Sequence, residues 1–227
     1  MTVEKKVLKI AKLLRKTYGK PGSRKTLPID ELIRTILSQN TNDKNSLAAF
    51  AILKKSIASW DEILKMNTRK IAGLIKHAGL ASIKARRIKE ALSEINRREG
   101  RLSLAGIARM DIESAKNYLM SIKGVGPKTA ACVLLFSFGK PIMPVDTHIF
   151  RVAKRLGLLA KDAGIAEAHD ILTNTIPKDL IYELHLGIIS HGRKTCRAAG
   201  PKCGSCVLYG ICDFELKRRY REKRQCQ

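Results

Sequence analysis

Apolar residues recur at helical spacing along most of the chain, and no segment shows the strict apolar–polar alternation of a half-buried strand. The N-terminal stretch shows the pattern clearly, because one helical face collects Val3, Val7, Ile10, Ala11 and Leu14. This spacing predicts a helix over 3–17 with one buried face. Runs of β-branched residues are short throughout, so we predict an all-α fold.

Capping residues and glycines divide the rest of the chain into further helices. Ser59, with Glu62 three residues later, has the pattern of a capping box that starts a short helix. Ser82 is expected to cap a longer helix that ends before Gly100. We expect helices from about 30 to 37, from 43 to 56, from 59, from 67 to 78, from 82 to 98 and from 111. The cations of the long helix are expected to face solvent: Lys84, Arg86, Arg87, Lys89, Arg97 and Arg98.

The stretch from Met120 to Asp146 joins a tight turn to several chemically useful residues. One helix ends, the chain turns through residues 123–126 (KGVG), and a second helix starts at Pro127, a residue suited to the first helical position. Bare backbone amides at a helix N-terminus suit an anion such as a DNA phosphate. Lys128 supplies an amine, which is a nucleophile when unprotonated. Asp146 supplies a carboxylate, although the commonest role of an aspartate before a helix is that of an N-cap.

The charge balance indicates the kind of partner. The 227 residues include 44 Lys and Arg against 20 Asp and Glu, a formal net charge of +24. Such an excess favours nucleic acid as the partner, with an anionic membrane surface as the alternative. The longest apolar run, at about 130–139, is half of the roughly 20 residues that a membrane span needs, and the N-terminus lacks the features of a signal peptide. We therefore expect an intracellular monomer that binds DNA and no membrane.

Four of the six cysteines follow the spacing C-x6-C-x2-C-x5-C, at Cys196, Cys203, Cys206 and Cys212. In an intracellular chain this grouping indicates a metal site before disulfides. Four thiolates suit a structural zinc ion or an iron–sulfur cluster. Zinc modules more often pair two short C-x2-C hooks, whereas this chain has one, which favours iron–sulfur. Cys132 is expected in the core, and Cys226, in the basic tail, is expected to play no part.

These motifs together resemble the endonuclease III family of helix-hairpin-helix DNA glycosylases, over about residues 28–214. The resemblance rests on GVGPKTA around Lys128, VDTHIFRV around Asp146, and the cysteine spacing. It implies a six-helix domain at 24–138 and an iron–sulfur domain made from 1–23 and 139–227, with the active site in the cleft between them. It also implies that Lys128 and Asp146 are catalytic and that the four cysteines bind a [4Fe-4S] cluster. Relatives with tyrosine or serine in place of the lysine lack strong lyase activity, so Lys128 implies a bifunctional glycosylase and AP lyase.

The resemblance implies further residues that contact DNA. A glycosylase must fill the gap that an extruded nucleotide leaves, and the family does so from two loops. These loops correspond to Ser38–Thr41, with Gln39 and Asn40, and to Gly79-Leu80, with Leu80 as a wedge. A polar helix end and a partly buried leucine are the ordinary alternatives. His148 matches a family histidine near the lesion pocket, with a structural histidine as the alternative. Phosphate contacts are implied for the hairpin turn and the first cysteine loop: Lys123, Gly124, Val125, Gly126, Arg193, Lys194, Arg197 and Lys202.

The expected activity is removal of oxidised pyrimidines from duplex DNA that contains damaged bases or abasic sites, through a lysine Schiff base and β-elimination. Gln39-Asn40 looks more like archaeal relatives and plant 5-methylcytosine glycosylases than like bacterial endonuclease III. Mismatched thymine, 5-methylcytosine or an alkylated base is therefore the alternative substrate. Two alternatives come from other classes. A non-catalytic damage-binding module needs neither Lys128 nor Asp146, and an iron–sulfur redox protein leaves the +24 charge unexplained.

Overall fold

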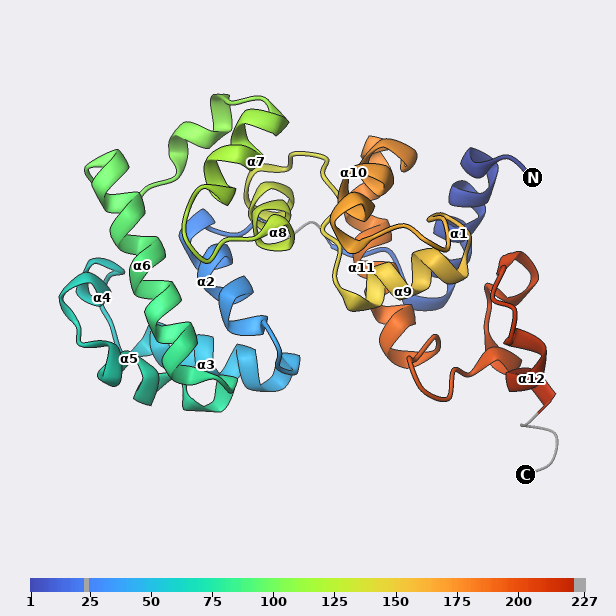
Figure 1. Ribbon diagram of the computed structural model, residues 1–227, viewed down its shortest axis with the longest axis horizontal. Helices are drawn as coiled ribbons and strands as arrows, with labels where there is room; N and C mark the ends of the chain where they lie inside the picture. The colour runs from blue at the N-terminus through green and yellow to red at the C-terminus, as the bar shows by residue number, and fades with distance from the viewer. Residues whose placement is uncertain (23–24, 223–227) are drawn as a thin grey trace. The chain divides into compact units, whose positions relative to one another are not determined.

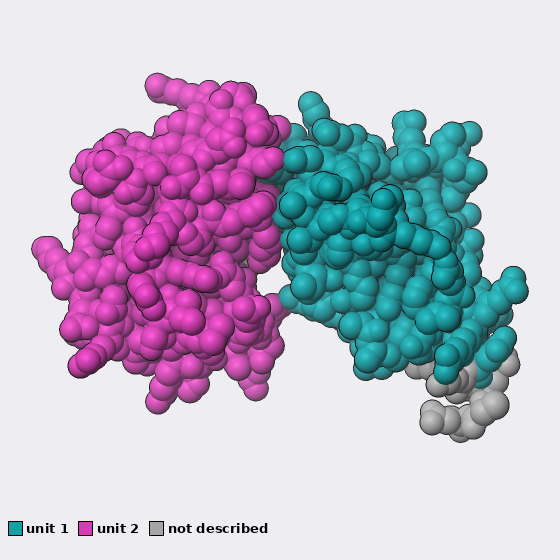
Figure 2. Space-filling view, in the orientation of Figure 1, with its two compact units in different colours: residues 1–23, 141–227 teal, residues 24–140 magenta. Residues whose placement is uncertain are grey.

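The structure, a computed structural model, describes residues 1–22 and 25–222 (Figure 1). These residues form α-helices and short 3-10 helices and contain no strand, so the all-α prediction is confirmed. The chain divides into two compact units, residues 24–140 and residues 1–23 with 141–227 (Figure 2). The boundary after residue 140 lies two residues beyond the expected one. Cys226 and the end of the basic tail lie outside the described residues.

The unit of residues 24–140 is built around α8 (Pro127–Phe138). This helix is apolar on all sides, and Ala130, Ala131, Val133 and Leu134 are completely buried, as a central helix requires. It packs against α2 (Pro28–Ser38). The other elements of the unit are α3 (Asp43–Lys55), α4 (Asp61–Lys65), α5 (Thr68–Leu74), η1 (Lys76–Ala78), α6 (Ala81–Glu99), η2 (Ala105–Arg109) and α7 (Ile112–Met120).

Two helix starts in this unit differ from the prediction. At α4 the backbone of Trp60 is already helical, because the buried indole is anchored by a 2.7 Å hydrogen bond to Asp30. Glu62 instead accepts the backbone N–H of Ala58, so Ser59 forms no capping box. At α6 the N-cap is Leu80, in a left-handed conformation. The helix therefore begins at Ala81 without a side-chain cap, and Ser82 already lies inside it.

The cations of α6 are only partly solvated. Arg86 and Arg97 are exposed as predicted. Lys84 is 1% exposed, so the prediction of a solvated side chain is wrong there. Its ammonium group reaches two backbone carbonyls, which replace the water it loses. Lys89 is half-buried and donates to the carbonyl of Met66 at 2.7 Å.

The second unit, residues 1–23 with 141–227, is centred on α11 (Ile181–Lys194), which packs against α1 (Val3–Tyr18) and α9 (Thr147–Arg155). α1 buries Val7, Ile10, Ala11 and Leu14 as predicted, while Val3 remains 50% exposed. The other elements are α10 (Ile165–Thr175), η3 (Lys178–Leu180), η4 (Cys203–Ser205), η5 (Tyr209–Ile211) and α12 (Lys217–Glu222). Every helix in the described ranges is too short or too polar to span a bilayer.

Candidate functional site

The turn between α7 and α8 is fixed by two buried side chains and one left-handed glycine. Ile122 and Val125 are 1% and 5% exposed, and the N–H of Val125 donates to the carbonyl of Ile122 at 3.0 Å. Gly124 has φ +86°, and a Cβ at this position would lie 3.2 Å from Cγ of Arg87. Both the backbone angle and the lack of space favour glycine here. The sequence prediction of a turn at 123–126 followed by a helix from Pro127 is confirmed.

The solvent side of this turn consists mostly of backbone. Gly124 and Gly126 are exposed, and α8 starts immediately after them. The first N–H groups of a helix lack intrahelical acceptors and carry the positive end of its dipole. Lys123 is exposed and forms a 3.1 Å ion pair with Glu90. The turn can therefore bind an anion through backbone amides, with a lysine close by.

Lys128 lies in the first turn of α8 and is half-buried. Its Nζ donates to the hydroxyl oxygen of Ser38, at the end of α2, over 3.4 Å. The next residue of that loop, Gln39, contacts both α6 and α8: it accepts from Arg87 Nη1 at 2.6 Å and donates to Thr129 Oγ1 at 3.5 Å. The structure thus brings the predicted loop at 38–41 next to the predicted catalytic lysine.

The tips of the two predicted insertion loops share an unusual backbone conformation. Asn40 has φ +51° and Leu80 has φ +49°, and among the described residues no other non-glycine residue has a positive φ. Asn40 is exposed, and Leu80 is 52% exposed. Asparagine tolerates the left-handed region, but leucine rarely occupies it. An exposed leucine in a strained conformation gains nothing from burial, which points to a use outside the folded unit.

Asp146 lies in the other unit, where it caps α9. Its carboxylate accepts the backbone N–H of Ile149 at 2.7 Å, so the ordinary N-cap role is present in the structure. Asp146 is half-buried and follows a buried extended segment, residues 142–145. The cap fixes the direction of the carboxylate, which leaves its second oxygen to act on another group.

Two buried histidines hold the segment that leads to Asp146, and sequence reasoning assigned them no role. His169 and His185 are 4% and 3% exposed. The ring Nδ1 of His169 lies 3.2 Å from the carbonyl of Met143, and that of His185 lies 3.1 Å from the carbonyl of Pro144. An extended segment has no helical partners for its carbonyls, so these rings satisfy them. The helical spacing of the histidines shows that they are buried but does not reveal their partners.

His148 is half-buried and faces a cationic neighbour. Its Nδ1 lies 3.0 Å from Nη2 of Arg151, and the same guanidinium donates to the carbonyls of Gly192 and Cys196 at 2.9 and 3.0 Å. Burial is the main cause that lowers the pKa of His148; Asp146 raises it, and Arg151 lowers it further. A neutral ring that accepts from Arg151 agrees with the structural alternative for this histidine.

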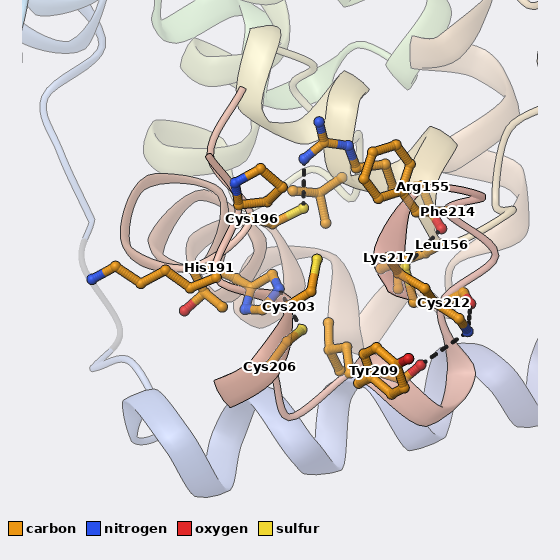
Figure 3. Close-up of a pocket in the computed structure, with 15 residues that line it drawn as sticks. Arg155, Leu156, His191, Cys196, Cys203, Cys206, Tyr209, Cys212, Phe214 and Lys217 are labelled. Atoms are coloured by element: carbon orange, nitrogen blue, oxygen red, sulfur yellow. Dashed lines mark hydrogen bonds between the residues drawn. The ribbon is translucent and has the colours of Figure 1, made fainter. Parts of the chain in front are cut away.

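The four C-terminal cysteines line one pocket (Figure 3). All four are free thiols and are partly buried. Burial raises the pKa of Cys206 to about 11 and raises the pKa values of Cys203 and Cys212 as well. Within the described ranges, no three His, Cys, Asp or Glu side chains form a group that could hold a metal ion. The donor chemistry, four soft thiols around one pocket, nevertheless fits an iron–sulfur cluster.

Three other pocket residues were missed at the level of sequence. Arg155 Nη1 donates to Sγ of Cys196 at 3.3 Å, and its guanidinium lies 4.2 Å from the ring centre of Phe214. His191 is 2% exposed, and its Nε2 lies 3.6 Å from Sγ of Cys206. Lys217 donates to the carbonyls of Tyr209 and Cys212. Arg155 and Lys217 act against burial and lower the pKa of Cys203, which favours the thiolate form that binds metal.

Four of the basic residues predicted to meet phosphates lie at the end of α11 and in the first cysteine loop, and Lys202 also lines the pocket. Arg193, Lys194 and Arg197 are exposed, and Lys202 is partly exposed. Lys194 Nζ lies 5.5 Å from the ring centre of Tyr18, and Arg197 donates to the carbonyl of Gly200 at 3.2 Å. The end of α11 and the cysteine loop therefore present cations to solvent, and their contact with phosphates stays a prediction of the family resemblance.

Comparison with known proteins gives consistent matches. The model of the HhH-GPD superfamily of base excision DNA repair proteins matches residues 33–178. Endonuclease III of Sulfolobus acidocaldarius is 34% identical over 187 residues, which are 82% of this chain and 81% of the relative. Endonuclease III of Thermotoga maritima is 32% identical over 201 residues, or 88% and 90% of the two chains. A solved endonuclease III–DNA complex superposes with a TM-score of 0.81 at 26% identity and covers both chains completely.

Proposed function

The chain belongs to the HhH-GPD superfamily of base excision DNA repair proteins, and we propose that it removes oxidised pyrimidines from duplex DNA through Lys128. It is an endonuclease III-like DNA glycosylase and AP lyase. The endonuclease III relatives, at 30% identity or more over most of their length, support this class.

Lys128 is the observation that carries the proposal. Its amine lies half-buried at the start of α8, beside an anion-binding turn. In the described part of the chain it is hydrogen-bonded to the neutral hydroxyl of Ser38 and forms no ion pair. A lysine that only binds phosphate can lie fully exposed, whereas a nucleophilic amine benefits from a fixed, half-buried position.

The reaction consists of four steps: displacement of the base, opening of the sugar ring, β-elimination and hydrolysis of the imine. The unprotonated Nζ of Lys128 attacks C1′ of the damaged nucleotide, the N-glycosidic bond breaks, and its electron pair leaves with the base. The sugar ring then opens, giving a protonated Schiff base between Nζ and C1′. A base removes a proton from C2′, the bond from C3′ to its phosphate oxygen breaks, and the strand is cut by β-elimination. Water finally hydrolyses the imine and returns Lys128 to its amine form.

Asp146 is proposed to stabilise the positive charge that builds on the sugar as the glycosidic bond breaks. This is the role of the carboxylates in glycosidases, whose transition states are oxocarbenium-like. The cap to Ile149 orients the carboxylate, and the histidine-held segment before it limits its movement. Asp146 therefore combines a structural and a chemical role.

The surface residues are proposed to position the duplex. The backbone amides of the hairpin turn and the cations Arg193, Lys194, Arg197 and Lys202 bind phosphates. Gln39, Asn40 and Leu80 occupy the gap that the extruded nucleotide leaves. The exposed, strained tips at Asn40 and Leu80 support this assignment. A +24 net charge adds attraction that does not depend on sequence and falls as salt rises.

The four cysteines are proposed to hold a [4Fe-4S] cluster, with Arg155, His191 and Lys217 around it. When bound, the cluster supplies a rigid anchor for the loop between Cys196 and Cys212. The residues of this chain then hold the loop's cations at fixed positions toward DNA. Purified protein should therefore contain iron and absorb near about 400 nm, while a colourless zinc-loaded protein would refute the assignment.

Borohydride trapping on a duplex with one abasic site tests the proposal, followed by a panel of damaged and mismatched bases. We expect a covalent adduct that disappears in Lys128→Gln and persists in the matched control Lys123→Gln, which changes the exposed lysine of the same turn. DNA affinity should be similar in the two variants. An adduct retained in Lys128→Gln would overturn the nucleophile. Preferential excision of thymine mispairs, 5-methylcytosine or alkylated bases would overturn the oxidised pyrimidine.

A further inference from the structure

Lys84 is a buried cation that the chemistry described so far does not use. It lies in the first turns of α6 and is 1% exposed, although lysines are almost never fully buried. Burial is the main cause that lowers its pKa, with Arg87 as the second cause. Burying an ammonium group is unfavourable unless it is fully hydrogen-bonded. The hydrogen bonds of the Lys84 ammonium group must therefore offset its unfavourable burial.

Those contacts join two separate loops. Nζ donates to the carbonyl of Leu37 at 2.8 Å and to the carbonyl of Ala78 at 2.7 Å. Leu37 lies in the last turn of α2, and Ala78 is the last residue of η1. Carbonyls at the end of a helix lack intrahelical donors and carry the negative end of the dipole. One ammonium group therefore satisfies the ends of two helical elements at the same point.

The strained tips follow these carbonyls directly. Asn40 comes three residues after Leu37, and Leu80 comes two residues after Ala78. Both have φ near +50°, a left-handed conformation that leucine in particular rarely adopts and that persists only where the surroundings impose it. Neither tip is buried, so its own packing cannot impose the conformation. The restraint must come from the base of each loop, where Lys84 binds.

Arg87, three residues further along α6, also restrains the loop at 38–41. It donates to Oε1 of Gln39 at 2.6 Å, and its stem packs against Gly124 of the hairpin turn. α6 thus holds the loop at 38–41 by two side chains and the loop at 79–80 by one. Figure 1 shows α6 as the long helix of this unit, and it packs against α2, α4 and α5.

We propose that Lys84 is a positioning residue that clasps the loops at 38–41 and 79–80 into one preformed element for insertion into duplex DNA. The proposal rests on the proposed function for its DNA step. The clasp itself is a property of the free protein. Because both loops are already ordered in the free protein, DNA binding does not incur the entropic cost of ordering them. The two tips then enter the DNA together, on a single rigid base.

Hydrogen exchange on the free protein tests the clasp. We compare Lys84→Met with Lys89→Met, which removes a lysine from the same helix that donates to one carbonyl outside these loops. Peptides covering residues 36–42 and 75–81 should exchange about tenfold faster in Lys84→Met and unchanged in Lys89→Met. Faster exchange in only one loop, or in neither, overturns the clasp.

A measurement on the unaltered protein covers the case in which Lys84→Met does not fold. With increasing denaturant, the amides of Gln39, Ala78 and Gly79, which are hydrogen-bonded in the structure, should open together in one step below global unfolding. Opening at different denaturant concentrations would show that the loops are independent and would overturn the proposal.

The role of Lys84 in inserting the two loops into DNA is tested by comparing activity on duplex DNA with activity on single-stranded DNA. Lys84→Met should lower base excision in duplex DNA about tenfold, while trapping at an abasic site in single-stranded DNA, which needs no insertion, changes less than about twofold. Leu80→Ala should show the same pattern. Equal losses on both substrates would overturn the positioning role. Absence of trapping by the unaltered protein would instead refute the proposed function and leave the exchange result standing.

Discussion

The two units hold their functional residues by different means. In residues 24–140, a buried apolar helix and a clasping lysine fix the hairpin turn and both loops with groups of the chain itself. In the other unit, Asp146 is held in a similar way, whereas the cysteine loop is held mainly through backbone carbonyls that accept from Arg151 and Lys217. Between residues 196 and 212 only Pro201, Leu208 and Ile211 are buried. Because so little apolar surface is buried here, we expect the proposed cluster to contribute much of the order of this segment.

Substitution of Cys206 has the largest expected effect and tests whether the cysteine loop depends on a bound cluster for its order. Cys206→Ser should abolish iron binding and the absorption near about 400 nm, because serine is a poor ligand for iron–sulfur clusters. Peptides covering 196–216 should then exchange rapidly, while those of α2 and α8 keep their protection. Iron analysis and hydrogen exchange measure both effects.

Cys132→Ala is the matched control, since Cys132 is buried in α8, in the other unit. It should keep its full iron content and lose only a little stability, because the thiol is a small core side chain. Full iron loading in Cys206→Ser would contradict the cofactor assignment.

The second prediction concerns residues 24–140, the unit that is stabilised by packing around the buried apolar helix α8. Leu134→Ala leaves a cavity in α8, where Leu134 is completely buried, and should lower the free energy of unfolding by about 2–5 kcal/mol. Denaturant unfolding followed by circular dichroism measures it, and iron content should not change. Leu47→Ala, at a 50% exposed leucine of α3, should stay within about 0.5 kcal/mol. Equal losses in the two variants would contradict this account of the core.

The third prediction separates the two roles of Asp146. Asparagine caps helices about as well as aspartate, so Asp146→Asn should change stability by less than about 0.5 kcal/mol. The loss of charge should nevertheless lower base excision about 100-fold, measured under single-turnover conditions. Asp146→Ala should show the same kinetic loss and also lose about 1 kcal/mol of stability. If the loss of excision rate instead paralleled the loss of stability in the two variants, Asp146 would act only as a helix cap.

The smallest effect compares two glycines of one turn. Gly124→Ala should lower the free energy of unfolding by about 1–2 kcal/mol, because φ is +86° and Arg87 leaves little room for a Cβ. Gly126→Ala should be nearly neutral, since φ is −92° and no atom lies within 4 Å of the added Cβ. Thermal unfolding of the pair measures the difference, and similar melting temperatures would contradict the strain argument.

The sequence predicted what depends on periodicity and on local motifs. The apolar stripe of the first helix, the turn at 123–126 and the start of α8 at Pro127 follow from neighbouring residues alone, and the structure confirms them. The cysteines line one pocket because their spacing keeps them close along the chain. These features need no knowledge of distant contacts.

The predictions from sequence are wrong where contacts with residues far along the chain determine the local structure. Lys84 was predicted to be solvated because five other cations share its helix, yet two carbonyls from other elements bind it. Ser59 and Ser82 have the residue type of a cap, but the anchored indole of Trp60 and the left-handed Leu80 set the helix starts. His169 and His185 bind carbonyls 26 and 41 residues away, which no local pattern encodes.

The order of the chain has a consequence for how the protein is made. Arg15 and Glu183, whose side chains form two 2.7 Å hydrogen bonds between α1 and α11, are 168 residues apart. α1 leaves the ribosome before α11 and must wait for it before it can bury its apolar face, whereas residues 24–140 are contiguous and can fold during synthesis. Within that unit the chain's entry and exit are joined, because the N–H of Thr26 donates to the carbonyl of Phe136 at 3.1 Å. Once the unit has folded, it shortens the effective loop between α1 and α11, so the late closure of the other unit loses far less chain entropy than the sequence separation suggests.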